Sequence, residues 1–425
     1  MESMSTSIFG LTLIVTVMVF CNAALAEEAP VQVDELRCEY LRNPLGIDSS
    51  NPRLSWQLKS EARGVSQTAY QILVARTPET LADDKGDLWD SGKVASDQSV
   101  HVPYNGVSLD SRQACHWKVR VWTDGDTPSP WSAPGMWTMG LLTAEDWQGE
   151  WIGCDWMKNN EGSLPWLRKT FTLEKTPARA MAYVCALGYY ELYVNGQKVG
   201  DNVIAPAVTD YAKRVLYITH DITPFLKEGN NCVVLWLGRG WSMFLLEAAS
   251  QAGPLVRAQF EIEGVADTPL IVATDATWKT HPSPITPLGA MRSGDYGGER
   301  YDARQELPGW ARADLDDSGW NNVVVAVPPT PIVSAQNCEP NRILGDIKPA
   351  VVTKREDGGF LIDMGKNFVG WLEMKFPKGN EGNVVHFEYG DVFRENGKLQ
   401  SYNQRDEYVM TSGSSQLIFP RFNYH

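Results

Sequence analysis

The chain has 425 residues, a length that exceeds what one hydrophobic core accommodates and predicts two to four domains of roughly 100 to 200 residues each. Its contents of 43% hydrophobic and 21% charged residues are ordinary for a globular protein. A formal charge of −14 argues against a basic surface that binds nucleic acid or anionic lipid, so we expect no nucleic-acid partner.

Residues 1–26 read as a secretory signal peptide. An apolar stretch runs from Ile8 to Phe20, and Ala24-Leu25-Ala26 forms a small-x-small cleavage site. The stretch is shorter than the about 20 residues of a transmembrane helix. The region before it lacks Lys and Arg and carries Glu2, which leaves open a membrane-anchored N-terminus or a misassigned start. We expect a secreted or periplasmic protein with no membrane contact after cleavage. Loss of Glu2 then moves the formal charge to −13.

Six cysteines follow this segment, namely Cys38, Cys115, Cys154, Cys185, Cys232 and Cys338. They form no C-x-x-C and no other metal-like spacing, so the sequence predicts no zinc site. Cys38 and Cys115 fall in one predicted domain and could form a disulfide. Buried thiols, which are common in protein cores, are the alternative.

The first predicted domain spans residues 33–140. Alternation with a period of two residues marks strands at 52–56, 69–75 and 116–122, with turn clusters between them. Trp56 and Trp117 fit the core between the two sheets of a fibronectin III or immunoglobulin-like sandwich.

The second predicted domain spans residues 145–327. From Tyr189 the sequence alternates apolar and polar residues into Asn195-Gly196, the strongest short signal for a β-hairpin turn. Strand and turn patterns continue to the apolar run Cys232–Leu237 without a helical period. The prolines at 328, 329 and 331 then predict a stiff linker over residues 328–344. A third domain over 345–425 begins with the pattern Phe360–Trp371 and continues through His386–Val392.

The order of these motifs resembles bacterial α-L-rhamnosidases of glycoside hydrolase family 78. The features that carry the resemblance are Tyr193-Val194-Asn195-Gly196, then Thr209-Asp210-Tyr211, then Gly238-Arg239-Gly240-Trp241, with Gly298–Arg304 and Asp316–Trp320 further on. The resemblance implies an all-β chain: a fibronectin III or immunoglobulin-like sandwich, a jelly-roll sandwich, and a truncated concanavalin-like β-sandwich.

In that family, inverting hydrolysis of terminal α-L-rhamnosides uses a carboxylic acid and a carboxylate about 6.5 to 9.5 Å apart. The resemblance implies that both acids lie in a helical barrel, to which no segment here corresponds. The chain also lacks the amphipathic periodicity of such a barrel. No catalytic residue is therefore assigned, and we expect the chain alone to be inactive.

Other carboxylates could in principle form a site. They are Glu299, Asp302 and Glu306, close to Arg300 and Arg304, and further along Asp363, Glu388 and Asp391. Salt bridges and turn caps are the ordinary use of such residues in β-rich domains, and we expect it here.

Sugar binding is the alternative activity, because an aromatic ring beside polar side chains is the signature of a sugar site. The best combinations are Asp210 and Tyr211 with Arg214, and Arg239 with Trp241. We predict no cofactor; calcium is possible, but no motif assigns it. The prediction is the N-terminal accessory region of a secreted α-L-rhamnosidase acting on rhamnose-containing glycans or glycosides. The alternative is a secreted carbohydrate-binding or scaffolding protein without catalysis.

Overall fold

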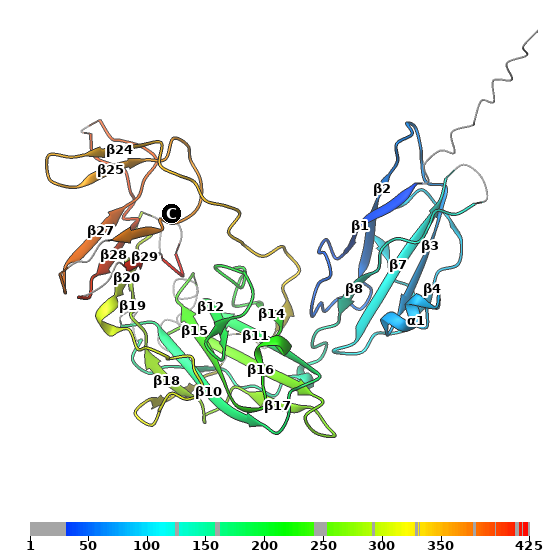
Figure 1. Cartoon of the computed structure of the whole chain (residues 1–425), viewed down its shortest axis with the longest axis horizontal. Helices are drawn as coiled ribbons and strands as arrows, with labels where there is room; N and C mark the ends of the chain where they lie inside the picture. The colour runs from blue at the N-terminus through cyan, green and yellow to red at the C-terminus, as the bar shows by residue number, and fades with distance from the viewer. Residues whose placement is uncertain are drawn as a thin grey trace, which may run out of the picture.

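The computed structural model describes residues 31–423 except 124–126, 158–161, 242–252, 291–293, 328–329, 331, 377–379, 396, 413–415 and 419. This part of the chain is almost entirely β-structure, with one five-residue helix, α1 (Pro78–Ala82), which confirms the predicted all-β class. Its sheets form three successive groups (Figure 1). The predicted signal peptide lies outside the described residues. The described residues include no helix with the length and apolar character of a membrane span.

The first group is a two-sheet sandwich. Its strands are β1 (Gln32–Cys38), β2 (Arg53–Lys59), β3 (Ala69–Ala75), β4 (Trp89–Asp90), β5 (Val94–Ala95), β6 (Val102–Pro103), β7 (Ala114–Trp122) and β8 (Gly135–Thr138). One sheet has the order β1-β2-β6, and the other has the order β4-β3-β7-β8 with β5 also on β3. Alternate residues of β7, including Trp117, point into the core where Trp56 also lies, as the period-two pattern predicts.

Cys38 and Cys115 share this core as free thiols. Burial raises the pKa of the Cys38 thiol well above its usual value and that of Cys115 to about 12. Of the two alternatives for this pair, the structure therefore contains the buried thiols.

The second group is a larger two-sheet sandwich. Its strands are β9 (Ile152–Gly153), β10 (Pro165–Leu173), β11 (Arg179–Leu187), β12 (Tyr189–Val194), β13 (Gln197–Lys198), β14 (Val215–Asp221), β15 (Gly229–Gly238), β16 (Leu255–Glu263), β17 (Leu270–Ala273), β18 (Lys279–Pro282), β21 (Asn321–Asn322), β22 (Val324–Val325) and β23 (Val333–Ala335). The sheet orders are β13-β12-β15-β10-β18-β21 and β22-β9-β16-β11-β14-β23. β17 also pairs with β16 in the second of these sheets. The apolar core between them includes Leu192, Leu235 and Phe260.

The Asn-Gly hairpin forms as predicted. Asn195 and Gly196 both have positive φ angles, 51° and 86°, and Val194 pairs with Gln197 across the two-residue loop. These are the backbone angles of a type I′ turn, which Asn-Gly adopts with little strain. The Asn195 side chain also holds the turn in the sandwich, because its Oδ1 accepts the Cys232 N–H at 2.9 Å.

The prediction of a linker over residues 328–344 was wrong for the residues of this range that the structure describes. β23 pairs in parallel with β14, and Arg342 forms a bridge with Asn202 and an ion pair with Asp201 at 3.0 Å. The prolines end before Ile332, so the residues of β23 keep the backbone N–H groups that a sheet requires. This segment therefore extends the sheet of the second group.

The third group contains β19 (Ile285–Leu288), β20 (Gly298–Asp302), β24 (Val351–Lys354), β25 (Phe360–Asp363), β26 (Met374–Phe376), β27 (Val384–Glu388), β28 (Arg405–Val409) and β29 (Gln416–Ile418). Its largest sheet has the order β19-β20-β28-β27, while β24-β25 and β26-β29 are two-stranded. β24-β25 lies at the outer end of the molecule (Figure 1), with Val351 and Phe360 more than half exposed.

This sheet corrects the expectation that the second and third domains are separate sandwiches. β19 and β20 come from the sequence range of the second domain, yet β20 pairs in parallel with β28 of the third. The strands lie so close that a Cβ added to Gly298 would be 1.6 Å from the Arg405 carbonyl oxygen. One sheet therefore combines strands from the sequence ranges of both predicted domains.

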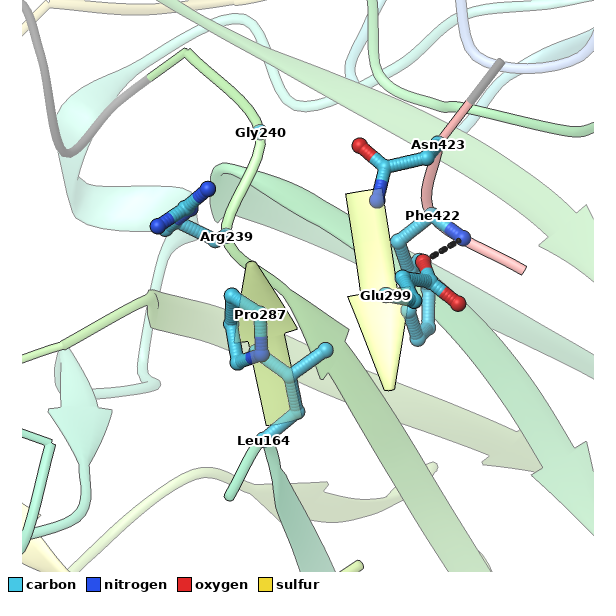
Figure 2. A pocket seen from close by; sticks show the side chains of 7 residues that line it. All are labelled: Leu164, Arg239, Gly240, Pro287, Glu299, Phe422 and Asn423. Atoms are coloured by element: carbon cyan, nitrogen blue, oxygen red, sulfur yellow. Dashed lines mark hydrogen bonds between the residues drawn. The ribbon is translucent and has the colours of Figure 1, made fainter. Parts of the chain in front are cut away.

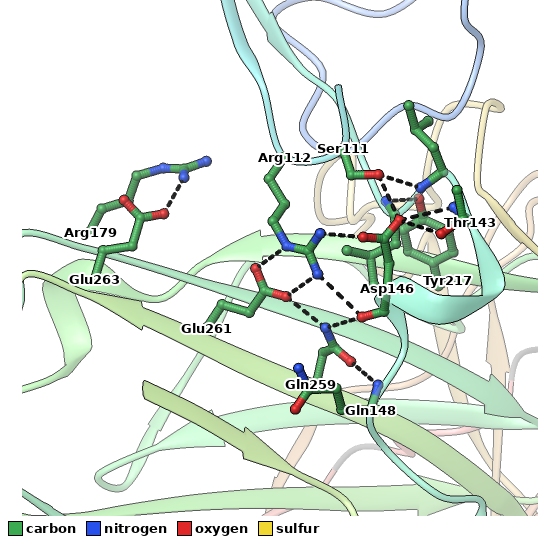
Figure 3. A network of polar contacts seen from close by, with 12 residues as sticks. Ser111, Arg112, Thr143, Asp146, Gln148, Arg179, Tyr217, Gln259, Glu261 and Glu263 are labelled. Atoms are coloured by element: carbon green, nitrogen blue, oxygen red, sulfur yellow. Dashed lines mark hydrogen bonds and ion pairs between the residues drawn. The ribbon is translucent and has the colours of Figure 1, made fainter. Parts of the chain in front are cut away.

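Arg112 connects the first group to the second (Figure 3). Its guanidinium donates two hydrogen bonds to Glu261 of β16, at 2.7 and 2.8 Å, one to the Asp146 carboxylate at 2.5 Å and one to the Asp146 carbonyl oxygen at 3.2 Å. Asp146 lies in the 3₁₀ turn η1 (Ala144–Asp146) between the groups. Burial acts to raise the pKa of Asp146, but hydrogen bonds from Ser111 and Arg112 outweigh it and lower this pKa to about 2.

Protonation of His220 is expected to destabilise the protein in acid. As the pH falls from about 6.5 to about 4, it should lower the free energy of unfolding by no more than about 3 kcal/mol. His220 is 8% exposed, its Nε2 lies 2.7 Å from the Tyr190 hydroxyl, and burial lowers its pKa from 6.5 to about 4. Between these values the unfolded chain binds the extra proton, so acid favours unfolding. Urea denaturation at pH 7 and pH 4.5 measures the effect.

The matched variants are His220→Gln and, as a control, His386→Gln, whose side chain is 69% exposed. Only His220→Gln should reduce the difference between the two pH values. If both variants keep the wild-type difference, His220 does not cause it.

Candidate functional site

The five residues predicted to bind sugar do not form one exposed site. Asp210 is exposed and pairs with Lys213 at 2.9 Å, and Arg214 is exposed beside it. Tyr211 is 1% exposed and packs in an apolar cluster that includes Leu187 and Leu255. The Tyr211 ring presents no face to solvent in this structure, and sugar binding by Tyr211 stays a prediction.

Arg239 and Trp241 follow β15, in the other sheet. Arg239 is 4% exposed and donates to the carbonyl oxygens of Leu288 and Gly289, at 3.1 and 3.0 Å, which ties the end of β19 to β15. Burial lowers its pKa to about 10. Trp241 is half-buried against an aromatic cluster. Arg239 is therefore a structural residue, and sugar binding at these positions stays a prediction.

A small cavity lies beside Arg239 (Figure 2). It is lined by Leu164, Arg239, Gly240, Pro287, Glu299, Phe422 and Asn423. It has room for little more than a water-sized molecule, about 10 Å³, far below the roughly 300 to 1,000 Å³ of ordinary ligand pockets. The cavity is better described as a seam where segments of the second and third groups meet.

Glu299 is the central group of this seam. Its carboxylate accepts the backbone N–H of Phe422 at 2.6 Å, drawn in Figure 2, and that of Arg421 at 3.0 Å. It is 4% exposed, and burial together with the nearby Asp406 carboxylate raises its pKa to about 7. We expected Glu299 to serve a surface or a turn. That expectation was wrong, because chain segments from both groups cover it.

Asp406 of β28 lies on the other side of Glu299. Its Oδ1 accepts the Glu299 backbone N–H at 2.8 Å, and its Oδ2 accepts the Tyr389 hydroxyl at 2.9 Å. These two residues also line a second cavity between β20, β27 and β28, of about 300 Å³ including its open part. Both acids are committed to hydrogen bonds within the protein: Asp406 binds partners in the third group, and Glu299 binds the backbone of residues 421 and 422.

Arg421 binds a second buried acid, Glu191 of β12. Arg421 Nη1 lies 3.2 Å from Glu191, which also accepts from Lys198 at 2.6 Å and from the Tyr193 hydroxyl at 2.7 Å. Although burial acts to raise it, Arg421 and Lys198 hold the pKa of Glu191 below its usual value. The Arg421 guanidinium also lies 4.6 Å from the ring centre of Trp236, in cation–π range.

The sequence analysis missed Glu191, Asp406, Arg421 and Phe422. Glu191 occupies a polar position in an alternating strand, the usual place of a solvent-facing residue. Its partner Arg421 is 230 residues away, so no local signal marks the pair.

Of the other candidate acids, Asp302 and Asp363 have the expected salt bridge or turn cap, whereas Glu306 and Glu388 accept hydrogen bonds from hydroxyl groups. Asp302 caps the 3₁₀ turn η3 (Ala303–Gln305) and pairs with Arg304 at 2.7 Å, and Glu306 accepts the Tyr301 hydroxyl at 2.8 Å. Asp363 accepts the Gly365 N–H in a turn, and Glu388 accepts the Ser401 hydroxyl. Among the described residues, no group of three or more His, Cys, Asp or Glu side chains is arranged to hold a metal ion.

Three family models match the chain in order. They are a Rha78A-like N-terminal immunoglobulin domain over residues 33–143, the α-L-rhamnosidase N-terminal domain over 175–345, and the bacterial α-L-rhamnosidase concanavalin-like domain over 353–425. The fold and these matches together define an array of β-sandwich domains of the kind that α-L-rhamnosidases contain. The chain belongs to the bacterial α-L-rhamnosidases and corresponds to their N-terminal domains.

Curated relatives support this assignment. An α-L-rhamnosidase of Formosa agariphila is 29% identical over 98% of this chain and 48% of its own length. One from Alteromonas sp. is 31% identical over 90% of this chain and 43% of its own length. The chain therefore spans about half the length of these relatives.

Solved structures show the same arrangement. An α-L-rhamnosidase from Dictyoglumus thermophilum superposes with a TM-score of 0.84 at 34% identity, over 93% of this chain and 46% of its own. The Streptomyces avermitilis α-L-rhamnosidase, solved in complex with L-rhamnose, gives a TM-score of 0.81 at 25% identity, over 93% of this chain and 55% of its own.

Proposed function

We propose that this chain is the N-terminal accessory region of a secreted α-L-rhamnosidase that removes terminal α-linked L-rhamnosyl residues from glycans or glycosides with inversion. The observation that carries the proposal is the match of three rhamnosidase family models in order along one chain. The signal-peptide pattern of residues 1–26 supports export. The acidic net charge is consistent with a partner other than nucleic acid.

The accessory region is proposed to act as a rigid platform. Arg112 links the first group to the second, and Arg421 links residues 420–423, which Glu299 of the third group also binds, to Glu191 of the second. An inverting glycosidase requires an acid and a base facing an open space large enough for sugar and water. The buried acids Glu299, Asp406 and Glu191 instead bind backbone amides and side chains of the chain itself.

The chain of residues 27–425 is expected to give no measurable hydrolysis of an aryl α-L-rhamnoside. A general acid or base contributes about 10²- to 10⁴-fold each, so a protein without the pair should match a heat-denatured control. The measurement is release of the aryl alcohol by purified protein. Turnover that survives repurification would contradict this expectation and place a catalytic pair among the β-sandwiches.

The family assignment itself is tested on the gene. We expect the reading frame to continue past His425. The full product should release rhamnose, and NMR should show that the anomer formed first has the configuration opposite to that of the substrate. A stop codon after His425 with a stable secreted product would instead favour the carbohydrate-binding or scaffolding alternative.

A further inference from the structure

Two exposed tyrosines meet beside the sheet that contains β20 and β28. Tyr296 precedes β20 and is 37% exposed, and Tyr402 precedes β28 and is 44% exposed. Their ring centres lie 6.3 Å apart, and the ring planes make an angle of 70°. An edge-to-face pair of this kind leaves at least one face of each ring uncovered by its partner. The two rings therefore form an aromatic corner on the surface.

The chain fixes the position of one ring relative to the other. The Tyr296 N–H donates to the Tyr402 carbonyl oxygen at 3.1 Å. The side-chain amide of Asn403 donates to the Asp295 carboxylate, which also accepts the Ala290 N–H at 3.1 Å. The aromatic corner is thus preorganised, which lowers the entropic cost of binding a ligand there.

Tyr402 occupies a strained position in the backbone. The Gln404 N–H donates to the Ser401 carbonyl oxygen at 2.8 Å and closes a turn in which Tyr402 and Asn403 have φ angles of 48° and 61°. Two central residues with positive φ are typical of a type I′ turn, which favours Asn, Asp and Gly and strains a tyrosine. Burial offsets this strain only in part, because Tyr402 stays 44% exposed. Strain retained at an exposed aromatic residue points to a function of the ring.

Tyr40 in the first group is a matched case with a structural explanation. It also has a positive φ, 70°, in a two-residue turn closed by Cys38 and Leu41, and it is 51% exposed. The Arg53 guanidinium lies 5.0 Å from the Tyr40 ring centre, in cation–π range, and the His101 ring packs against it with ring centres 4.8 Å apart. The protein itself therefore uses the Tyr40 ring, which makes Tyr40 a control for Tyr402.

Polar side chains lie beside the aromatic corner. Glu388 is exposed at the end of β27, and its carboxylate accepts the Ser401 hydroxyl at 2.7 Å. The Gln400 amide donates to the Tyr402 hydroxyl. Together with the Asn403 amide, these groups provide both donors and acceptors. An aromatic face for the apolar side of a pyranose, with polar groups for its hydroxyls, is the combination that sugar sites use.

We propose that Tyr296 and Tyr402 form a sugar-binding subsite that takes an α-L-rhamnosyl unit. One ring stacks on the apolar face of the pyranose, and the other contacts the methyl group attached to C5 of L-rhamnose. A 6-deoxy sugar fits two rings set at an angle, because its methyl group adds a second apolar surface. The choice of rhamnose rests on the proposed α-L-rhamnosidase function, whereas the aromatic corner itself does not.

Saturation-transfer NMR of methyl α-L-rhamnoside with the chain of residues 27–425 tests the proposal. For a ligand of this size we expect a Kd on the order of millimolar. Tyr296→Ala and Tyr402→Ala should each weaken binding by at least about tenfold. Tyr402→Phe should retain binding because it keeps the ring, and Tyr40→Ala should leave binding unchanged.

Three results of this experiment would overturn the proposal. The first is no saturation transfer to methyl α-L-rhamnoside in the wild-type protein, and the second is equal binding by wild type and Tyr402→Ala. The third concerns methyl α-L-mannoside, which carries a hydroxyl on the carbon that is a methyl group in rhamnose. It should bind more weakly, and equal binding of the two glycosides would exclude the proposed contact with the methyl group.

Tyr402→Asn separates binding from folding. Asparagine adopts positive φ with less strain, so the urea midpoint of the variant should equal or exceed that of wild type while sugar binding falls by at least about tenfold. A clearly lower midpoint would show that the Tyr402 ring serves stability and would overturn the proposal. Binding is measured on a chain for which we expect no hydrolysis. Failure of this subsite is therefore a separate result from failure of the proposed function, which the rhamnose released by the longer product decides.

Discussion

The variant Phe422→Ala is expected to detach the third group from the second, with a loss of about 3 to 5 kcal/mol in the free energy of that contact. Phe422 is buried in an aromatic cluster that includes Trp166, Trp236 and Tyr193. Alanine would leave a cavity against Gly238 and weaken the seating of the neighbouring Arg421. In urea, the third group of the variant should unfold at a lower concentration than the second group. If the wild-type protein already shows two unfolding transitions, the difference between their midpoints should be larger in the variant.

The matched control is Phe393→Ala in the same group. Phe393 is 52% exposed, so its truncation should change stability by no more than about 0.5 kcal/mol. Hydrogen exchange of β28 localises the effect, and we expect faster exchange only in the Phe422 variant. Equal urea profiles for the two variants would show that Phe422 does not anchor the third group.

The variant Arg112→Ala is expected to destabilise the contact between the first and second groups by about 3 to 5 kcal/mol. Its guanidinium is shared by Glu261, which is 5% exposed, and by Asp146. Removal of the cation leaves two partly or fully buried carboxylates without their main partner. Small-angle scattering should show a wider range of orientations of the first group, and urea should unfold that group earlier.

The control for this second prediction lies next to it in Figure 3. Arg179 pairs with Glu263 at 2.7 Å, but the two side chains are 31% and 41% exposed. An ion pair open to water contributes about 0 to 1 kcal/mol, so Arg179→Ala should leave scattering and unfolding nearly unchanged. A loss as large for Arg179→Ala as for Arg112→Ala would contradict the role assigned to Arg112.

Arg112 and Glu299 differ in their acid–base properties. Arg112 has no acid–base transition near neutral pH, because guanidinium groups stay protonated. Glu299 does titrate near neutrality, since burial and Asp406 raise its pKa to about 7.

Prediction from sequence succeeded where the signal was local. Asn195-Gly196 forms its hairpin because two neighbouring residues determine the backbone of the turn. The alternation around Trp117 predicted a half-buried strand because side chains of a strand point alternately to its two faces. The sugar-binding prediction for Tyr211 lacked such a signal, since burial depends on the other segments that cover it.

The sequence alone determined that this is an all-β protein, the order of its domains and its resemblance to α-L-rhamnosidases, because strand periodicity, turns and family motifs are encoded by residues close together in the chain. Only the tertiary structure decided that β20 joins β28 and that Glu299 binds Arg421. Glu299 and Arg421 are 122 residues apart, and either would be an ordinary surface residue by composition. Their contact depends on how whole sheets pack, and a local pattern does not contain that information.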